Sequence, residues 1–90
     1  MVDTIEDQIY TRLRMLRTER GLSRKELAAA VGVHYQTIGY LERGEYNPSL
    51  ALALRIAKHF QLPVEAVFSL EPMRPLSAFL TGARKPASNE

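Results

Sequence analysis

Residues 22–44 read LSRKELAAAVGVHYQTIGYLERG and predict two short helices joined by a tight turn. Ser23 and Glu26 have the spacing of a capping box, in which each side chain accepts a backbone amide at a helix start. Gly32 stands where a helix most easily ends in the left-handed backbone region. A second helix is therefore expected over residues 35–43.

Apolar side chains recur at helical spacing along both predicted helices. His34 occupies the expected N-cap position of the second helix, and Gly44 follows its end. Two short helices joined in this way are typical of a helix-turn-helix, which lays its second helix in the DNA major groove. The side chains expected to face inward are Leu27, Ala28, Val31, Ile38 and Leu41.

The same spacing extends on both sides of this stretch, over about residues 12–68. The matching positions are Arg17, Gly21, Leu22, Ser23, Glu26, Leu27, Ala28, Gly32, Val33, Gln36, Thr37, Ile38, Leu41, Glu42, Gly44, Asn47, Pro48, Ser49 and Leu50. On these residues the chain resembles the phage-repressor-like (Xre/Cro) helix-turn-helix family of bacterial and phage transcription regulators, in its small stand-alone type. The resemblance implies an all-α, five-helix DNA-binding domain with its helix-turn-helix at helices 2 and 3, plus a short C-terminal extended segment.

Composition narrows the class of protein further. The chain has 90 residues, 46% of them hydrophobic and 24% charged, which fits one small globular domain. It has no cysteine, so disulfides, thiolate zinc sites and a cysteine nucleophile are excluded. Its two histidines stand far apart, and no catalytic constellation appears, so we expect no enzyme, cofactor or metal. No apolar run approaches the ~18 residues of a membrane span, so we expect a cytoplasmic protein without a membrane partner.

Positive charge is concentrated just before the predicted helix-turn-helix, although the net charge is only +2. A basic block beside a helix that enters DNA suits the phosphate backbone. The alternative is a solvated helix face with ordinary lysine and arginine content. The block consists of Arg12, Arg14, Arg17, Arg20, Arg24 and Lys25, with Glu19 as its single acid.

Three further helices are expected around the motif. The first is predicted from about Thr4 or Ile5 to Arg20, with one apolar face at spacings of four, four and three. The fourth follows Ser49 as N-cap, and the fifth covers residues 63–67. The apolar face of the first is predicted to consist of Ile5, Ile9, Leu13 and Leu16, and that of the fourth of Leu50, Ala53, Leu54, Ala57 and Phe60.

The chain is expected to divide into a DNA-binding domain (1–68), an extended dimerisation segment (69–80) and a disordered tail (81–90). Residues 68–80 are apolar and interrupted by prolines, and they predict extended pieces around 68–70 and 76–80. A twofold partner would bury these side chains against their own copies. The alternative is that they fold back over the first and fifth helices. The predicted dimer contacts are Phe68, Leu70, Met73, Leu76, Phe79 and Leu80.

The resemblance implies roles for individual residues. Gln36 can pair with adenine through its side-chain amide, and Thr37 offers a hydroxyl and a methyl group. The pairing of Arg17 with Glu42 is implied as a structural ion pair. The implied base-reading residues are Tyr35, Gln36, Thr37, Gly39 and Tyr40, and the implied phosphate ligands are Arg17, Ser23, Arg24, His34, Arg43, Tyr46 and Asn47.

These features predict a sequence-specific regulator of transcription that binds double-stranded DNA. We expect a repressor that binds an inverted-repeat operator as a homodimer, with helix 3 in the major groove. The alternative is an antitoxin-type protein that binds DNA and also a protein partner, through its C-terminal segment.

Overall fold

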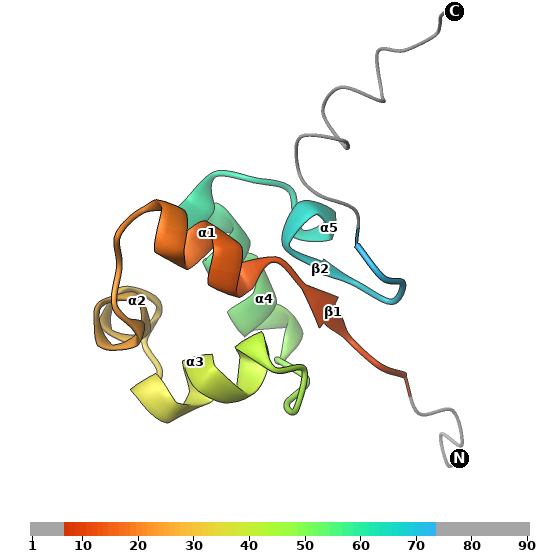
Figure 1. Cartoon of the computed structure of the whole chain (residues 1–90), viewed down its shortest axis with the longest axis horizontal. Coiled ribbons are helices and arrows are strands. Elements are labelled where there is room, and N and C mark those ends of the chain that lie inside the picture. Colours follow the sequence, from red (N-terminus) through yellow and green to blue (C-terminus); the bar gives the residue numbers. More distant parts are fainter. Residues whose placement is uncertain (1–6, 74–90) are drawn as a thin grey trace, which may run out of the picture.

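The computed structural model describes residues 7–73, which form five helices and one pair of short strands (Figure 1). The five predicted helices are confirmed, whereas the strand pair is an addition to the expected all-α fold. The elements are, in chain order, β1 (Tyr10–Thr11), α1 (Leu13–Glu19), α2 (Arg24–Val31), α3 (Tyr35–Glu42), α4 (Leu50–Phe60), α5 (Val64–Val67) and β2 (Phe68–Ser69).

Local signals at both ends of α2 explain its bounds. Ser23 Oγ accepts a hydrogen bond from the Glu26 amide at 3.0 Å, and the Glu26 carboxylate accepts one from the Ser23 amide at 2.8 Å. Gly32 follows the last turn with φ +79°, a backbone conformation that strains residues with side chains. The predicted capping box and glycine stop are both confirmed, and together they set the turn into α3.

Side chains also cap the starts of α3 and α4. His34 Nδ1 accepts a hydrogen bond from the Gln36 amide at 3.2 Å, and Ser49 Oγ accepts one from the Leu52 amide at 3.1 Å. Both predicted N-caps are therefore confirmed. The end of α4 is less conventional, because Gln61 takes the left-handed conformation with φ +57° where glycine is the common choice.

The prediction for the first helix is wrong at its start, because α1 begins at Leu13 rather than near Thr4 or Ile5. Thr4 and Ile5 themselves lie outside the described residues, and Ile9 precedes β1 without belonging to a helix. The apolar spacing is correct from Leu13 onward, since Leu13 and Leu16 are buried.

Hydrogen bonds at Thr11 explain why α1 starts late. Thr11 lies opposite Phe68 in the antiparallel pair of β1 and β2. Its Oγ1 donates to the Val67 carbonyl at 2.8 Å and accepts from the Leu13 amide at 3.0 Å. The strand pair thus holds the chain extended up to the first turn of α1, and the β-branched and aromatic side chains of this stretch suit that conformation.

One hydrophobic core lies between the helices, and α4 contributes a face that differs from the predicted one. Ala53, Ala57 and Phe60 are buried as expected, whereas Leu50 and Leu54 are 73% and 49% exposed. Leu52 and Ile56 are buried in their place, because the helix is rotated relative to the predicted face. The core cluster consists of Leu13, Leu16, Leu27, Ala28, Val31, Ile38, Leu41, Leu52, Ile56, Ala57, Phe60 and Val67.

The segment after α5 is extended at Phe68–Ser69, in agreement with the sequence, and pairs with its own chain. Phe68 is half-buried against the core, as the fold-back alternative expected for this residue. Leu70 points outward and is 61% exposed. The predicted dimer contacts Leu76, Phe79 and Leu80 and the predicted disordered tail (81–90) lie outside the described residues.

Candidate nucleic-acid interface

The outer face of α3 carries the side chains expected to meet DNA bases. Tyr35 and Tyr40 are 40% and 45% exposed, and Gln36 is exposed beside them. The inward residues Ile38 and Leu41 are fully buried or nearly so, which fixes the rotation of the helix. The core therefore holds α3 with its polar and aromatic face directed to solvent.

Glu42, at the end of α3, binds two arginines. Arg17 Nε donates to Glu42 Oε2, and Arg17 Nη1 donates to the Leu22 carbonyl at 2.8 Å. Arg24 Nε donates to Glu42 Oε1 at 3.1 Å. The Arg17 and Glu42 side chains are 11% and 2% exposed, so the ion pair that the resemblance implied is present and buried.

Gly39 has little exposed surface, because two arginine side chains lie over it. A Cβ atom at this position would stand 3.2 Å from Arg43 Nη1 and 3.9 Å from Arg24 Cδ. The surface that faces solvent here thus belongs to the arginines and not to the glycine. Gly39 was expected to read bases, but it lies beneath the side chains of Arg24 and Arg43.

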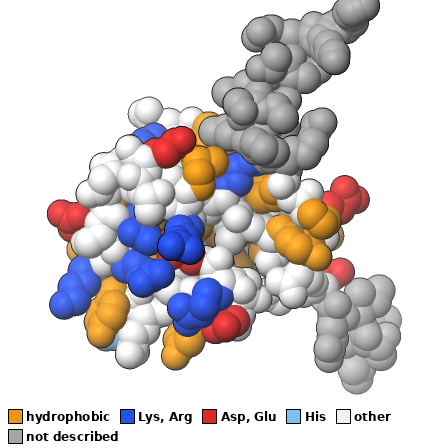
Figure 2. Space-filling view, in the orientation of Figure 1, with side chains coloured by type: hydrophobic (Ala, Val, Ile, Leu, Met, Phe, Trp, Pro, Cys, Tyr) orange, Lys and Arg blue, Asp and Glu red, His pale blue; other side chains and the backbone are white. Residues whose placement is uncertain are grey.

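Basic and aromatic side chains alternate around α3. Lys25 Nζ lies 5.3 Å from the centre of the Tyr35 ring, and Arg43 Cζ lies 5.3 Å from the centre of the Tyr40 ring. Figure 2 shows Lys and Arg side chains gathered over α2 and α3, next to hydrophobic side chains. This arrangement attracts a polyanion and offers flat rings at the same surface.

The remaining expected phosphate ligands border this face. Tyr46 is 47% exposed and Asn47 is also exposed, in the loop that follows α3. Ser23 and His34 precede α2 and α3, and both are exposed while their side chains cap those helices. Thr37 is half-buried at the edge of the α3 face.

The basic block does not act as one phosphate-binding surface. Arg12 is 8% exposed, and its Nη1 donates to the Ala66 carbonyl at 2.7 Å, so its guanidinium is bonded within the protein interior. Arg20 donates to the Phe60 carbonyl at 3.1 Å and lies over the Phe60 ring. The interpretation of the block as a single phosphate site is therefore wrong for Arg12, because the carbonyl of Ala66 in α5 binds its guanidinium.

Sequence reasoning missed two further contacts of the site residues, besides the ion pair of Arg24 with Glu42. Lys25 meets Tyr35 across two helices, and no local pattern indicates that contact. Glu45 Oε1 accepts from Arg43 Nε at 3.1 Å, and the short separation of these two charges was a signal that could have found the pair.

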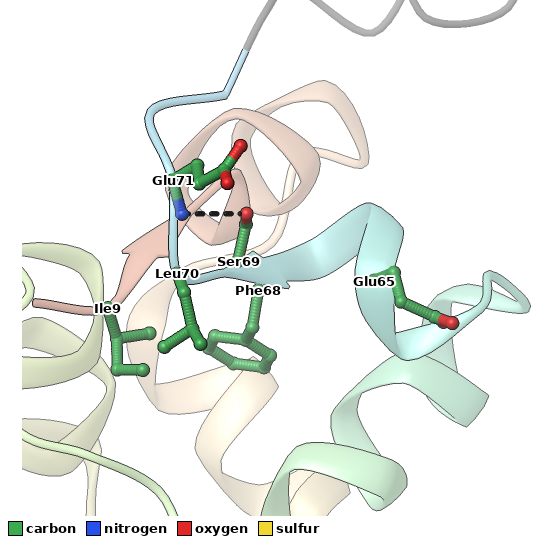
Figure 3. Close-up of a pocket in the computed structure, with 6 residues that line it drawn as sticks. All are labelled: Ile9, Glu65, Phe68, Ser69, Leu70 and Glu71. Carbon is green, nitrogen blue, oxygen red and sulfur yellow. Dashed lines mark hydrogen bonds between the residues drawn. The ribbon is translucent and has the colours of Figure 1, made fainter. Parts of the chain in front are cut away.

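A second surface feature lies beside the strand pair. An apolar groove of about 400 Å³ is lined by Ile9, Phe68 and Leu70, with Glu65 and Glu71 at its margin. Figure 3 shows Ile9, Leu70 and Phe68 side by side, while Glu65 stands apart on α5. The groove is open to solvent along the exposed Leu70.

Two features are absent from residues 7–73, the part of the chain that the structure describes. In this part of the chain, no helix is long and apolar enough to cross a membrane. The same residues hold no cluster of three or more histidine and carboxylate side chains placed to bind a metal ion.

Residues 13–67, from the first residue of α1 to the last of α5, match the family described as HTH_3, helix-turn-helix. The chain belongs to the HTH_3 family. The matched region is more than half of the sequence and contains every helix of the fold described above. The resemblance noted from the sequence is thereby confirmed.

Named relatives are regulators of transcription. An uncharacterized HTH-type transcriptional regulator of Archaeoglobus fulgidus is 48% identical over 58 residues, which are 64% of this chain and 83% of that protein. The HTH-type regulator YgzD of Bacillus subtilis is 45% identical over 60 residues, 67% of this chain and 91% of that protein. Archaea as well as bacteria thus carry close relatives.

The solved structures agree with this assignment. The restriction-modification controller protein C.AhdI of Aeromonas hydrophila superposes with a TM-score of 0.57 at 38% identity, over 61% of this chain and 83% of that chain. This HTH_3 protein is accordingly a DNA-binding transcription regulator and not an enzyme.

Proposed function

We propose that this regulator is a repressor that binds an inverted-repeat operator as a homodimer, with α3 in the major groove. The observation that carries the proposal is the outward face of α3, where exposed Tyr35, Gln36 and Tyr40 are bordered by cations. A helix displayed in this way fits the major groove, and neighbouring cations neutralise the phosphates on either side.

Gln36 is the proposed reader of adenine, because its amide can bond N6 and N7 at once. Tyr35 and Tyr40 would pack on thymine methyl groups or donate a hydroxyl to phosphate. Thr37, at the edge of the face, would contribute a methyl or hydroxyl contact. These contacts would give the sequence preference.

Phosphate contacts would come from the elements around α3. Arg24 stands in the first turn of α2, where exposed amides and a cation favour an anion. Tyr46 and Asn47 are exposed in the loop beyond α3. The other proposed phosphate ligands are Arg17, Ser23 and His34, with Arg17 mainly a structural residue because of its buried ion pair.

The homodimer is proposed to form at the apolar groove beside β2. Leu70 is 61% exposed there, and Ile9 and Phe68 are only half-buried. A twofold partner would cover this apolar surface with its own copy. Met73 and, beyond the described residues, Leu76, Phe79 and Leu80 would extend the interface.

Repression is proposed partly from a relative. The protein RstR of Vibrio cholerae, named a cryptic phage CTXphi transcriptional repressor, is 32% identical over 59 residues, 66% of this chain and 53% of that protein. A protein that occupies an operator also blocks polymerase without needing any further surface, which makes repression the simplest outcome of binding.

The test is selection of bound duplexes from a random pool, followed by the stoichiometry of the complex on the enriched sequence. We expect an inverted repeat bound by two chains, with half-site centres roughly 34 Å apart. Failure to enrich any sequence at low salt would reject the sequence-specific function. A single chain on the operator, with an exposed groove that binds a fluorescent apolar dye, would favour the antitoxin-type alternative.

Two variants separate base reading from phosphate binding. Gln36→Ala should lose roughly 1–3 kcal/mol of discrimination at one base pair. Arg24→Ala should weaken binding to all sequences alike. It should also reduce the slope of the logarithm of affinity against the logarithm of salt concentration by about one. An unchanged preferred site with Gln36→Ala would contradict the assignment of this glutamine.

A further inference from the structure

A hollow of about 250 Å³ lies between α2 and the outer face of α3. Gly39 forms part of its lining, and the side chains of Arg24 and Arg43 lie over that glycine. The remaining lining comes from Tyr35, Gln36 and Tyr40. A concave site with two guanidinium groups and three groups expected to meet DNA therefore stands at the centre of the interface.

Each of the two arginines donates its Nε to a carboxylate. Arg24 Nε donates to Glu42 at 3.1 Å, and Arg43 Nε donates to Glu45 at 3.1 Å. A guanidinium bound through Nε still has one outer hydrogen on each of Nη1 and Nη2, and these two form a pair of parallel donors along the direction of the Nε–Cζ bond. The Tyr40 ring also lies within cation–π distance of Arg43, with 5.3 Å between Cζ and the ring centre.

Gly39 makes this placement of Arg43 possible. A Cβ atom at residue 39 would stand 3.2 Å from Arg43 Nη1, which is closer than ordinary van der Waals contact. A side chain there would require the Arg43 guanidinium to shift by a few tenths of an ångström at the least. Glycine in mid-helix lowers helix stability, and here it leaves room for the Arg43 guanidinium close to the helix backbone.

Arg43 also lies on the same helical face as Gln36. The two residues are seven positions apart, which is two turns of an α-helix, and both line the hollow. A donor pair on this face points where base edges lie when the helix occupies the groove. Arg24 belongs instead to the first turn of α2, at the border of the face, where phosphates pass.

We infer that Arg43 reads a guanine, by donating from Nη1 and Nη2 to its O6 and N7, and that Gly39 and Glu45 are the positioning residues for this contact. Arginine bonded to both acceptors of guanine is the commonest specific contact in the major groove. The inference rests on the proposed function, and it replaces the phosphate contact that the resemblance implied for Arg43.

The test uses the full chain and the enriched duplex, with guanine replaced one position at a time by 7-deazaguanine, which lacks N7. Inosine keeps O6 and N7 and lacks only the minor-groove amino group, so it is the matched control base. We expect one 7-deazaguanine position to weaken wild-type binding about five- to 150-fold, and Arg43→Ala to abolish that sensitivity. Inosine at the same position should leave binding unchanged.

Two variants test the positioning residues. Gly39→Ala and Glu45→Ala should each reduce the preference for that guanine while the far-ultraviolet dichroism remains that of the wild type. Lys58→Ala removes one positive charge from the exposed side of α4 and is the control for charge alone. Retention of the full guanine preference by Gly39→Ala would overturn the role of this glycine.

The outcomes distinguish this inference from the proposed function. An operator that is enriched by the wild type but shows no guanine whose N7 depends on Arg43 would overturn the inference and leave the function standing. Arg43→Ala that weakens every sequence alike and lowers the salt dependence by about one charge would assign Arg43 to phosphate. No enrichment by the wild type would reject both.

Discussion

At the scale of single residues, Glu42 shows how burial determines the contribution of an ion pair to stability. It binds Arg17 and Arg24 through its two carboxylate oxygens. The Arg17 side chain is 11% exposed, whereas that of Arg24 is 45% exposed. Water and salt screen the second pair but scarcely reach the first, so the two ion pairs should contribute very differently to stability.

Replacing each arginine by methionine tests this difference, because methionine keeps much of the apolar stem. Arg17→Met leaves the buried carboxylate without its main partner and should lower the free energy of unfolding by about 3–5 kcal/mol. Arg24→Met should lower it by about 0–1 kcal/mol. Urea denaturation of the two variants measures both values, and equal losses would contradict the argument.

The roles of site residues could be predicted from the sequence wherever their partners are close neighbours along the chain. The sequence placed Ser23, Gly32 and His34 correctly, because caps depend on neighbours along the chain. It assigned Arg12 to the DNA surface, although the partner carbonyl of Arg12 belongs to Ala66, 54 positions away. Contacts of that separation leave no periodic signal in a single sequence.

At the scale of elements, α4 shows a limit of periodicity. Its sequence LALALRIAKHF contains two overlapping apolar sets, and both satisfy helical spacing. The predicted set included Leu50 and Leu54, while the structure buries Leu52 and Ile56. The choice depends on how α2 and α5 pack against the helix, which the pattern of one helix does not contain.

The predicted start of α1 was wrong for a different reason. The apolar spacing continues toward the N-terminus beyond Leu13, where the helix begins. Ile9 extends the spacing of Leu13 and Leu16, yet the chain is extended at Tyr10–Thr11. The deciding contacts are with β2, near the other end of the domain. Pairing between such distant segments overrides local helical preference.

Thr11 offers a test of this element. Thr11→Val keeps the shape of the side chain but removes the hydrogen bonds to the Val67 carbonyl and from the Leu13 amide. We expect the free energy of unfolding to fall by about 1–3 kcal/mol, because both groups are left without that partner. Thr11→Ser keeps the hydroxyl and should lose clearly less. Thermal denaturation of the two variants compares them, and an equal loss would show that the methyl group matters instead.

At the scale of the whole molecule, the two surface features lie on different elements. The arginine and tyrosine side chains stand over α2 and α3, and the apolar groove lies beside β2 and α5. A partner in the groove would therefore leave the DNA-facing side of α3 uncovered. This separation is what a dimer that reads two half-sites requires.

Charge placed in the groove should separate the proposed dimer. Leu70→Glu puts an uncompensated carboxylate in the interface twice, once from each copy, and should raise the dimer dissociation constant by about a hundredfold or more. Folding of the single chain should be little affected, since Leu70 is 61% exposed. Sedimentation equilibrium measures the constant.

Leu54→Glu is the matched control, because Leu54 is also an exposed leucine, at 49%, but lies on α4 outside the groove. It should leave the association unchanged. Dissociation by Leu54→Glu and not by Leu70→Glu would move the interface to α4.

The antiparallel pair of β1 and β2 has a mechanical consequence. Tyr10 faces Ser69 and Thr11 faces Phe68, so the chain enters and leaves the domain at the same end of the pair (Figure 1). A tensile force on the two ends would load these hydrogen bonds one after another, in an unzipping geometry, and not together in shear. The pair would give way at low force, while the helices between residues 13 and 67 would still be intact.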